Sequence, residues 1–278
     1  MKYKILIDSM SNLKDGDLVD DEVLYGIVPL TLRVDGVDYI DDGTQDMAKV
    51  MPLIEESKKD TPISTSCPSP QAFLDKMTGA DKYIIITISN KLSGSYNAAN
   101  LAKSLFERPD DVFVLDSLSN CGPEELLARR ATELIHSGLS FEEIQSKLKE
   151  AVDEFHILFI INRYDSLIRT GRVSKIIASI ANILKIKPLG IGKDGVLCLQ
   201  EKVRTLEATI KRMVSYIGKY CKDTANRICI ISHTENPEKA KQLKEMIEAL
   251  YSFKEIIIRN HGVVNAEYTR TGALTVAF

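Results

Sequence analysis

Residues 83–99 read YIIITISNKLSGSYNAA and show how the chain passes from strand to helix. The β-branched run at 83–89 predicts a strand, and the alanine-rich stretch that starts near Ser95 predicts a helix directly after it. Similar runs at 3–7, 26–34 and 112–116 have helical patterns between most of them. This alternation is typical of a parallel sheet covered by helices, so we predict an α/β domain.

The part of the chain after Phe155 has a different pattern, with closely spaced strands as well as helices. Its predicted elements are, in order, a strand at 156–161, helical segments over 163–183, a hairpin of 188–192 and 196–201 around Lys193-Asp194-Gly195, a helix at 205–221, and strands at 227–232, 254–259 and 273–277. We therefore predict two lobes: an N-terminal parallel-sheet α/β domain at 1–155 and a C-terminal mixed-sheet α/β domain at 156–278.

Local signals mark one turn and three helix starts. Asp35-Gly36 between apolar runs predicts a type I′ hairpin, which would project from the first lobe. Ser140 with Glu143 forms a capping box, while Ser69-Pro70 and Asn236-Pro237 each place a capping residue before a proline. These signals predict helices at 140–154, 70–78 and 237–250.

Composition narrows the class of protein. The net charge of −3 and pI of about 5.9 lack the basic excess of a nucleic-acid binder. No segment approaches the roughly 18 uninterrupted apolar residues of a membrane span, so we expect no stable membrane insertion. The five cysteines form no C-x-x-C pair and do not cluster with histidine, which predicts reduced thiols in a cytoplasmic protein and no metal site.

Two polar loops stand at predicted helix starts. Ser93, Gly94 and Ser95 precede the alanine-rich helix, whose free N–H groups and partial positive charge would stabilise an anionic oxygen. The second loop, at 64–70, carries four hydroxyls, including those of Thr65 and Ser66, and one thiol. Simple helix capping and turn formation are the better explanation of each loop when it is taken alone. Together they offer several neutral donors, which suit one carboxylate or phosphate better than a metal.

A third segment, at 167–175, carries Arg169, Arg172 and Lys175 around Gly171. It is either a solvated basic turn or a docking point for a partner, with Arg169 and Arg172 as the contacts. Residues 176–184 follow and are apolar nearly all round. That pattern fits a buried helix and also the wall of an apolar tunnel.

Six short motifs occur in order along the chain: Asp8-Ser9, Thr65-Ser66-Cys67-Pro68-Ser69, Leu92-Ser93-Gly94-Ser95-Tyr96, Gly171-Arg172-Val173-Ser174, Ser232-His233-Thr234 and Gly272-Ala273-Leu274. Together they make the chain resemble the DegV family, bacterial fatty-acid-binding proteins that include the binding subunit of fatty acid kinase. The resemblance implies a two-lobed fold in which an acyl chain such as that of palmitate lies in an apolar tunnel. Its carboxylate would meet Thr65, Ser66 and Ser93 and be presented to a partner kinase that forms an acyl phosphate.

The chain departs from the family near its C-terminus. Where the family has Gly-x-His-x-Gly-Pro-Gly-Ala-Leu, residues 266–274 read AEYTRTGAL, so that Tyr268 replaces the histidine. A tyrosine hydroxyl also donates a hydrogen bond, and Arg270 would add a charge if it pointed inward. The alternatives are that Tyr268 only packs and that Arg270 faces solvent.

An enzyme is the competing class, either a hydrolase with Ser93 as nucleophile or a phosphotransferase acting on a small acidic or acyl substrate. The sequence contains neither a G-x-S-x-G elbow nor a G-x-x-x-x-G-K-S/T loop, and it shows no evident base for Ser93. The four histidines show no catalytic or metal-binding spacing and are expected to be structural. We therefore predict a lipid-binding protein without a cofactor rather than an enzyme.

Overall fold

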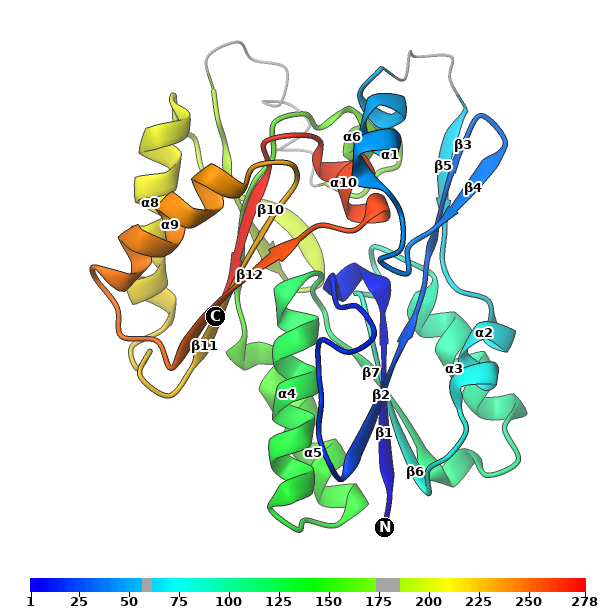
Figure 1. Cartoon of the computed structure of the whole chain (residues 1–278). Coiled ribbons are helices and arrows are strands. Elements are labelled where there is room, and N and C mark those ends of the chain that lie inside the picture. Colours follow the sequence, from blue (N-terminus) through cyan, green and yellow to red (C-terminus); the bar gives the residue numbers. More distant parts are fainter. Residues whose placement is uncertain (57–61, 174–185) are drawn as a thin grey trace.

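The computed structural model describes residues 1–56, 62–173 and 186–278. Among these residues the strands form three sheets, in the orders β2-β1-β6-β7, β4-β3-β5 and β10-β9-β8-β13-β11-β12. We call them sheet A, sheet B and sheet C; they lie at the bottom, the upper right and the left of Figure 1. The predicted α/β fold with a parallel and a mixed sheet is confirmed. The predicted boundary near residue 155 stays a prediction.

Sheet A contains only parallel strands: β1 (Tyr3–Asp8), β2 (Val23–Val28), β6 (Lys82–Thr87) and β7 (Val112–Asp116). Ile5 and Ile84 pack against α4 (Gly122–His136) and α5 (Phe141–Ala151) on one face. Leu6 and Ile85 pack against α2 (Pro70–Lys76) and α3 (Ser95–Leu105) on the other. Burial on both faces explains why these strands are apolar throughout. Their carboxyl ends share one edge of the sheet, which faces sheet C (Figure 1).

The strand predicted at 26–34 is in fact two strands in two different sheets. β2 ends at Val28 in sheet A, and β3 (Thr31–Val34) pairs with β4 (Val37–Ile40) and β5 (Ile63–Ser66) in the antiparallel sheet B. Pro29, which has no backbone N–H to donate, separates them. The predicted Asp35-Gly36 turn is present, with φ of 49° and 81° at its two residues.

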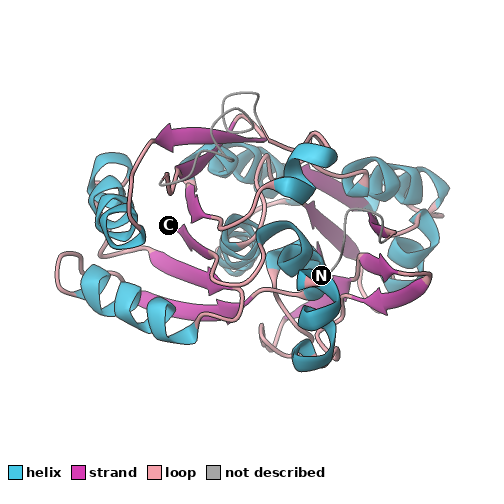
Figure 2. Ribbon diagram, turned by 90° about the horizontal axis from the view of Figure 1, so that it is seen from above, coloured by secondary structure: helices cyan, strands magenta, loops and turns pink. Residues whose placement is uncertain are grey.

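Sheet C is mixed, because β11 (Ile228–His233) and β12 (Glu255–Asn260) are parallel whereas the other neighbours are antiparallel. The remaining strands are β8 (Ile157–Ile160), β9 (Leu189–Lys193), β10 (Val196–Glu201) and β13 (Leu274–Ala277). Helices α8 (Leu206–Tyr220) and α9 (Pro237–Glu248) cover its outer face (Figures 1 and 2). The hairpin around Asp194-Gly195 joins β9 to β10 as predicted.

The predicted helix starts are found with one change. Ser140 and Glu143 make both bonds of a capping box at α5, and Ser69 caps α2. Asn236 precedes α9 but does not cap it; its side-chain amide instead donates to the Gly272 carbonyl at 2.9 Å. Three single-turn helices complete the first half: η1 (Ser9–Ser11), η2 (Pro109–Asp111) and η3 (Val152–Glu154).

Three further helices lie where the two halves of the chain meet. These are α1 (Met47–Glu55), α6 (Asp165–Arg169) and α10 (Val263–Thr269). Of the helical segments predicted over 163–183 the structure shows α6, while 174–185, including the apolar stretch 176–184, lies outside the described residues. α1 and α10 were not predicted; they pack against each other at the top of Figure 1.

Candidate functional site

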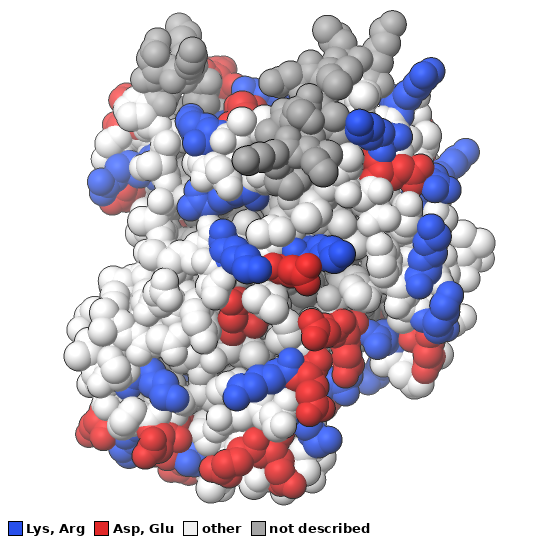
Figure 3. All heavy atoms as spheres, turned by 180° about the vertical axis from the view of Figure 1, so that it is seen from behind, with Lys and Arg blue, Asp and Glu red and all other residues white. Residues whose placement is uncertain are grey.

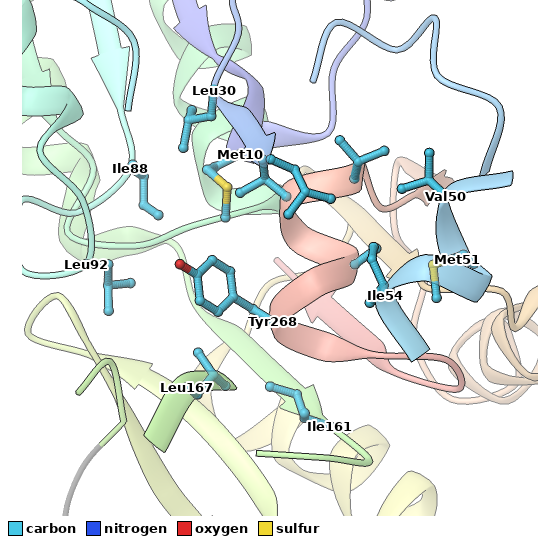
Figure 4. Close-up of a cluster of buried hydrophobic side chains, with 14 of the residues drawn as sticks. Met10, Leu30, Val50, Met51, Ile54, Ile88, Leu92, Ile161, Leu167 and Tyr268 are labelled. Atoms are coloured by element: carbon cyan, nitrogen blue, oxygen red, sulfur yellow. The ribbon is translucent and has the colours of Figure 1, made fainter. Parts of the chain in front are cut away.

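A cavity of about 270 Å³ lies between sheet A, sheet B and sheet C. It is bounded by the loops that follow β5, β6 and β7, by the inner face of sheet C, and by α10. Most of its wall is apolar and belongs to one buried cluster shared by both halves of the chain (Figure 4). Its apolar residues are Met10, Leu30, Ile88, Leu92, Ile157, Phe159, Ile161, Leu167, Leu197 and Val264.

One end of the cavity is lined by hydroxyls from the two predicted loops. Thr65 lies opposite the buried Leu32 on sheet B, and cross-strand partners share a face, so its side chain points inward. Ser66 and Ser93 line the same end. The loops touch, because a Cβ on residue 94 would lie only 3.0 Å from Cys67 Sγ. Glycine at 94 therefore permits the close approach of the two loops.

Ser93 and Ser95 have different positions. Ser93 lines the cavity, whereas Ser95 is fully buried behind it and does not. Their hydroxyl oxygens lie 3.0 Å apart, and Ser93 Oγ also accepts the Ser95 N–H at 3.3 Å. The residue that caps α3 is Gly94, without a side-chain bond. Ser93 and Gly94 therefore lie at the predicted position, and Ser95 supports Ser93 from behind.

Tyr268 reaches the hydroxyl end from α10. Its Oη lies 2.6 Å from Thr65 Oγ1, and its ring lines the cavity beside Leu92 and Leu167 (Figure 4). The interpretation that Tyr268 only packs is therefore wrong, since its hydroxyl is part of the polar end. The helix is held at its start by Asp41, which accepts the Val263 N–H at 2.8 Å.

Arg172 also lines the cavity rather than standing apart on the surface. Its guanidinium carbon lies 5.3 Å from the centre of the Tyr268 ring, and its Nε donates to the Leu92 carbonyl at 2.7 Å. Arg169 is half-exposed and pairs with Glu267 at 3.3 Å. The two arginines predicted for docking therefore both contact α10 residues, and Arg172 reaches the ligand space as well.

Arg270 does not line the cavity, although a ligand contact was expected for it. It does not face solvent either, because its side chain is only 2% exposed. The guanidinium pairs with Glu267 at 3.1 Å, donates to Ser166 Oγ at 2.9 Å and also donates to the Ile54 carbonyl. These partners tie α10 to α1 and α6, which makes Arg270 a structural residue.

A group of buried carboxyls lies behind the hydroxyl end and was not predicted as a group. Asp8 accepts the N–H groups of Ile88 and Met10 at 2.9 and 3.1 Å, and burial raises the pKa of Asp8 to about 6. Burial and the adjacent Asp8 raise the pKa of Glu124 well above its usual range, which favours its protonated form; neither of its carboxyl oxygens has a hydrogen-bond partner among the described residues. Burial also raises the pKa of Asp41, to about 7. Only Asp8, at the end of a parallel strand, carried a sequence signal.

The described part of the wall offers little for nucleophilic catalysis. Neither histidine nor a carboxylate is among its lining residues, so Ser93 has no base beside it. His261 is buried near His233, and burial lowers the pKa of His261 to about 3. Within 1–56, 62–173 and 186–278, no group of three or more His, Cys, Asp or Glu side chains could hold a metal ion. The geometry suits binding of a carboxylate and an apolar tail.

Comparison with known proteins agrees with this geometry. A family model described as "Uncharacterised protein, DegV family" matches residues 2–278. A DegV domain-containing protein of Streptococcus pyogenes serotype M3 is 32% identical over 100% of this chain and 99% of its own. The chain therefore belongs to the DegV family.

Solved structures share the fold over the full length. The fatty acid kinase B3 protein (Fak B3) of Streptococcus pneumoniae, loaded with linoleic acid, is 28% identical, with a TM-score of 0.90 and coverage of 100% of this chain and 99% of that one. A DegV family protein from Ruminococcus gnavus, refined with vaccenic acid, is 25% identical, with a TM-score of 0.89 and 99% of each chain covered. These structural neighbours are fatty-acid-binding proteins of the same family.

Proposed function

We propose that this protein binds a long-chain fatty acid, with the tail in the apolar part of the cavity and the carboxylate at the hydroxyl end. The observation that carries the proposal is the meeting of Thr65, Ser93 and Tyr268 at one end of an otherwise apolar cavity. Each buried CH₂ contributes about 0.8 kcal/mol, so the tail supplies affinity. The hydroxyls are required as well, because a carboxylate buried without donors would cost several kcal/mol.

The paired hydroxyls leave at least one proton for the ligand. When Thr65 and Tyr268 bond to each other, one of them is the donor and the other keeps its own hydrogen free. Ser93 offers a further hydroxyl, and Ser66 lies at the exposed rim. A carboxylate has two oxygens that accept such bonds, and the bonds would fix its orientation. The fatty acids carried by Fak B3 and by the R. gnavus protein support this choice of ligand.

The second half of the proposal is that the carboxylate is presented to a partner kinase, as the name of Fak B3 suggests for that relative. Ser66, Cys67 and Gly94 are exposed and line the cavity, so the carboxyl end lies next to the surface. Arg169 is half-exposed near this end and suits contact with an acidic partner surface. Under this proposal the protein presents a substrate and is not itself a catalyst.

Three further observations concern membrane insertion, the cysteines and the surface charge. No helix in the described ranges has the length and apolar content needed to cross a bilayer. All five cysteines are free thiols, which fits the proposed cytoplasmic location. Basic and acidic side chains are interspersed on the face opposite to that of Figure 1 (Figure 3).

The experiment combines the purified protein, a bound fatty acid, ATP and a bacterial fatty acid kinase catalytic subunit. We expect acyl phosphate to form only when the protein and the kinase are both present. Hydrolysis of acyl esters by the protein alone, lost in Ser93→Ala, would instead establish the hydrolase alternative. Lipid binding without any acyl phosphate would leave the binding proposal intact and overturn the presentation proposal.

A further inference from the structure

The inner face of sheet C forms one wall of the cavity, and two neighbouring strands contribute very different side chains to it. Successive side chains of a strand point to opposite faces, and on β8 it is Ile157 and Phe159 that line the cavity. The next strand, β9, reads LGIGK, and its leucine and isoleucine pack on the outer face with α8 and α9. The inner positions of β9 are therefore those of Gly190 and Gly192.

The two glycines allow large side chains of β8 to lie down on the sheet. Phe159 and Gly190 are register partners in the antiparallel pair of β8 and β9, so they share a face. The phenyl ring lies over the glycine, because a Cβ on residue 190 would overlap Cε2 and Cζ of Phe159. A Cβ on Gly192 would likewise lie 2.6 Å from Ile157 Cγ2. Strand side chains ordinarily stand roughly perpendicular to the sheet, so folding them over glycine deepens the cavity.

The cavity ends beside these residues, where α4 packs directly on sheet C. Ile157 lines the cavity, but its partner Ala277 on β13 does not. The start of α4 covers Ala277, because a Cβ on Gly122 would overlap Ala277 Cβ and lie 3.3 Å from Ile230 Cβ. Leu126, one turn later, packs in the same cluster as Ala277 and Ile230. A ligand in the cavity is therefore stopped at Ile157 in this direction.

The hydroxyl end of the cavity lies towards the other end of β8. Helix α10, which carries Tyr268, leads into β13, and Leu274 at the start of β13 pairs with Ile160. Ala277, at the end of β13, pairs with Ile157. Three residues of strand span about 10 Å, which separates the two ends. A fatty acid whose carboxylate is bound at the hydroxyl end therefore directs its methyl end towards Ile157.

We propose that Phe159, folded over Gly190, sets an upper limit to the length of the fatty-acid tail that the protein binds. The inference rests on the proposed function, because the cavity is taken to hold an acyl chain. A tail that stops short of this wall gains roughly fourfold in affinity with each further CH₂ that it buries. A longer tail must bend or leave carbons outside the cavity, so additional CH₂ groups stop contributing. The protein therefore selects straight-chain fatty acids by length.

Two substitutions should move this wall in opposite directions. Phe159→Leu replaces the ring by a smaller side chain and should move the limit to longer tails. Gly190→Ala puts a methyl group where the ring now lies; the sheet is behind the ring, so the ring would rise into the cavity and move the limit to shorter tails. The double variant should return towards the wild-type limit, because leucine does not need the space over residue 190. Phe253→Leu, in the outer cluster of sheet C, is the matched control and should leave the limit unchanged.

The test measures dissociation constants of the delipidated full-length protein for laurate, myristate, palmitate, stearate and arachidate, each kept monomeric. With each step of two carbons, the affinity of the wild-type protein should rise roughly fifteenfold and then level off or fall. In Phe159→Leu the affinity should go on rising for at least one further step. In Gly190→Ala it should level off at least one step earlier.

The outcomes separate this inference from the proposed function. Affinity of the wild-type protein that keeps rising through arachidate, or a limit that is the same in wild type and Phe159→Leu, would overturn the inference and leave fatty-acid binding intact. Failure of the wild-type protein to bind any member of the series would overturn the proposed function as well. Because the wild-type series and Phe159→Leu both bear on the limit, the inference stays testable even if Gly190→Ala does not fold.

Discussion

Thr65 Oγ1 and Tyr268 Oη lie 2.6 Å apart although 203 residues separate them in the chain. Thr65 belongs to sheet B and Tyr268 to α10, so the bond exists only when both halves of the chain are in place. It lies at the hydroxyl end of the cavity, which Ser93 also lines. Tyr268, which stands where the family resemblance implies a histidine, therefore makes a polar contact at this position.

The hydroxyls of Thr65 and Tyr268 should be energetically coupled in ligand binding. Thr65→Val and Tyr268→Phe each remove a hydroxyl and keep the shape, and each should weaken fatty-acid binding roughly fivefold to twentyfold. Because each change also leaves the other hydroxyl without its partner, the double variant should lose less than the sum of the two. Calorimetric titration of the four proteins measures this coupling. Fully additive losses would show that the two hydroxyls act independently.

Ser93 should contribute through a charge-assisted hydrogen bond. Ser93→Ala is expected to weaken fatty-acid binding by about 1.5–3 kcal/mol, the usual range for a bond to a charged group. Ser104→Ala is the matched control, since Ser104 lies on the exposed side of α3 and its hydroxyl donates to the Leu101 carbonyl. An unchanged dissociation constant for Ser93→Ala would remove Ser93 from the site.

Substitutions of Arg172 and Arg169 should affect lipid binding and the kinase reaction differently. From the sequence, Arg172→Ala is expected to leave lipid binding intact, but Arg172 lines the cavity and stacks on Tyr268, so we now expect weaker lipid binding as well as slower acyl-phosphate formation. Arg169→Ala removes a half-exposed ion pair and should change lipid affinity less than threefold while slowing the kinase reaction. Lipid binding and acyl-phosphate formation measured on both variants test this. Normal kinase turnover in Arg169→Ala would exclude Arg169 from docking.

Asp41 should make stability depend on pH. Its pKa is raised by burial to about 7, against about 3.9 in an unfolded chain. The folded state therefore keeps a proton that the unfolded state loses, so this group's contribution is complete below pH 4 and is lost as the pH rises towards 7. In thermal unfolding, the midpoint temperature of Asp41→Asn should rise relative to that of the wild-type protein as the pH is raised from 4 to 8. Asp35→Asn, in the exposed hairpin, is the control and should show no such rise. A difference in midpoint temperature between Asp41→Asn and wild type that stays constant with pH would contradict the account.

Glu124 should behave as a neutral group. Glu124→Gln replaces a protonated carboxyl by a neutral amide of nearly the same shape and should change the free energy of unfolding at neutral pH by less than about 1 kcal/mol. Glu124→Ala removes a fully buried side chain and opens a cavity, and should cost roughly 2–4 kcal/mol. Urea unfolding of the two variants distinguishes these effects. Equal losses would mean that Glu124 is charged in the folded protein.

The sequence predicted what depends on local signals. The capping box at Ser140, the Asp35-Gly36 turn and the apolar strands of sheet A are set by neighbouring residues, and the structure contains them. The strand at 26–34 was wrong because the two sides of Pro29 join different sheets, which is a tertiary choice. Helix α10 was missed because its seven residues are too short to show a period, and all of them are buried.

The candidate site was predicted only where its residues stand in a local sequence pattern. Ser93 and Thr65 stand in hydroxyl-rich loops that are visible in the sequence, and both line the cavity. The buried ion pair of Arg270 with Glu267 was not foreseen, because an arginine beside a loop is usually exposed. Asn120 carried no signal at all, since a lone asparagine in a turn is common and only the fold brings it to the cavity wall.

The central claim is that the cavity holds a fatty acid, and the most direct measurement is mass spectrometry of the protein purified from bacteria. Native spectra should show one lipid per chain, and denaturation should release a long-chain fatty acid that a matched extraction identifies. A protein that is free of lipid and that also fails to bind added palmitate or oleate would contradict the account.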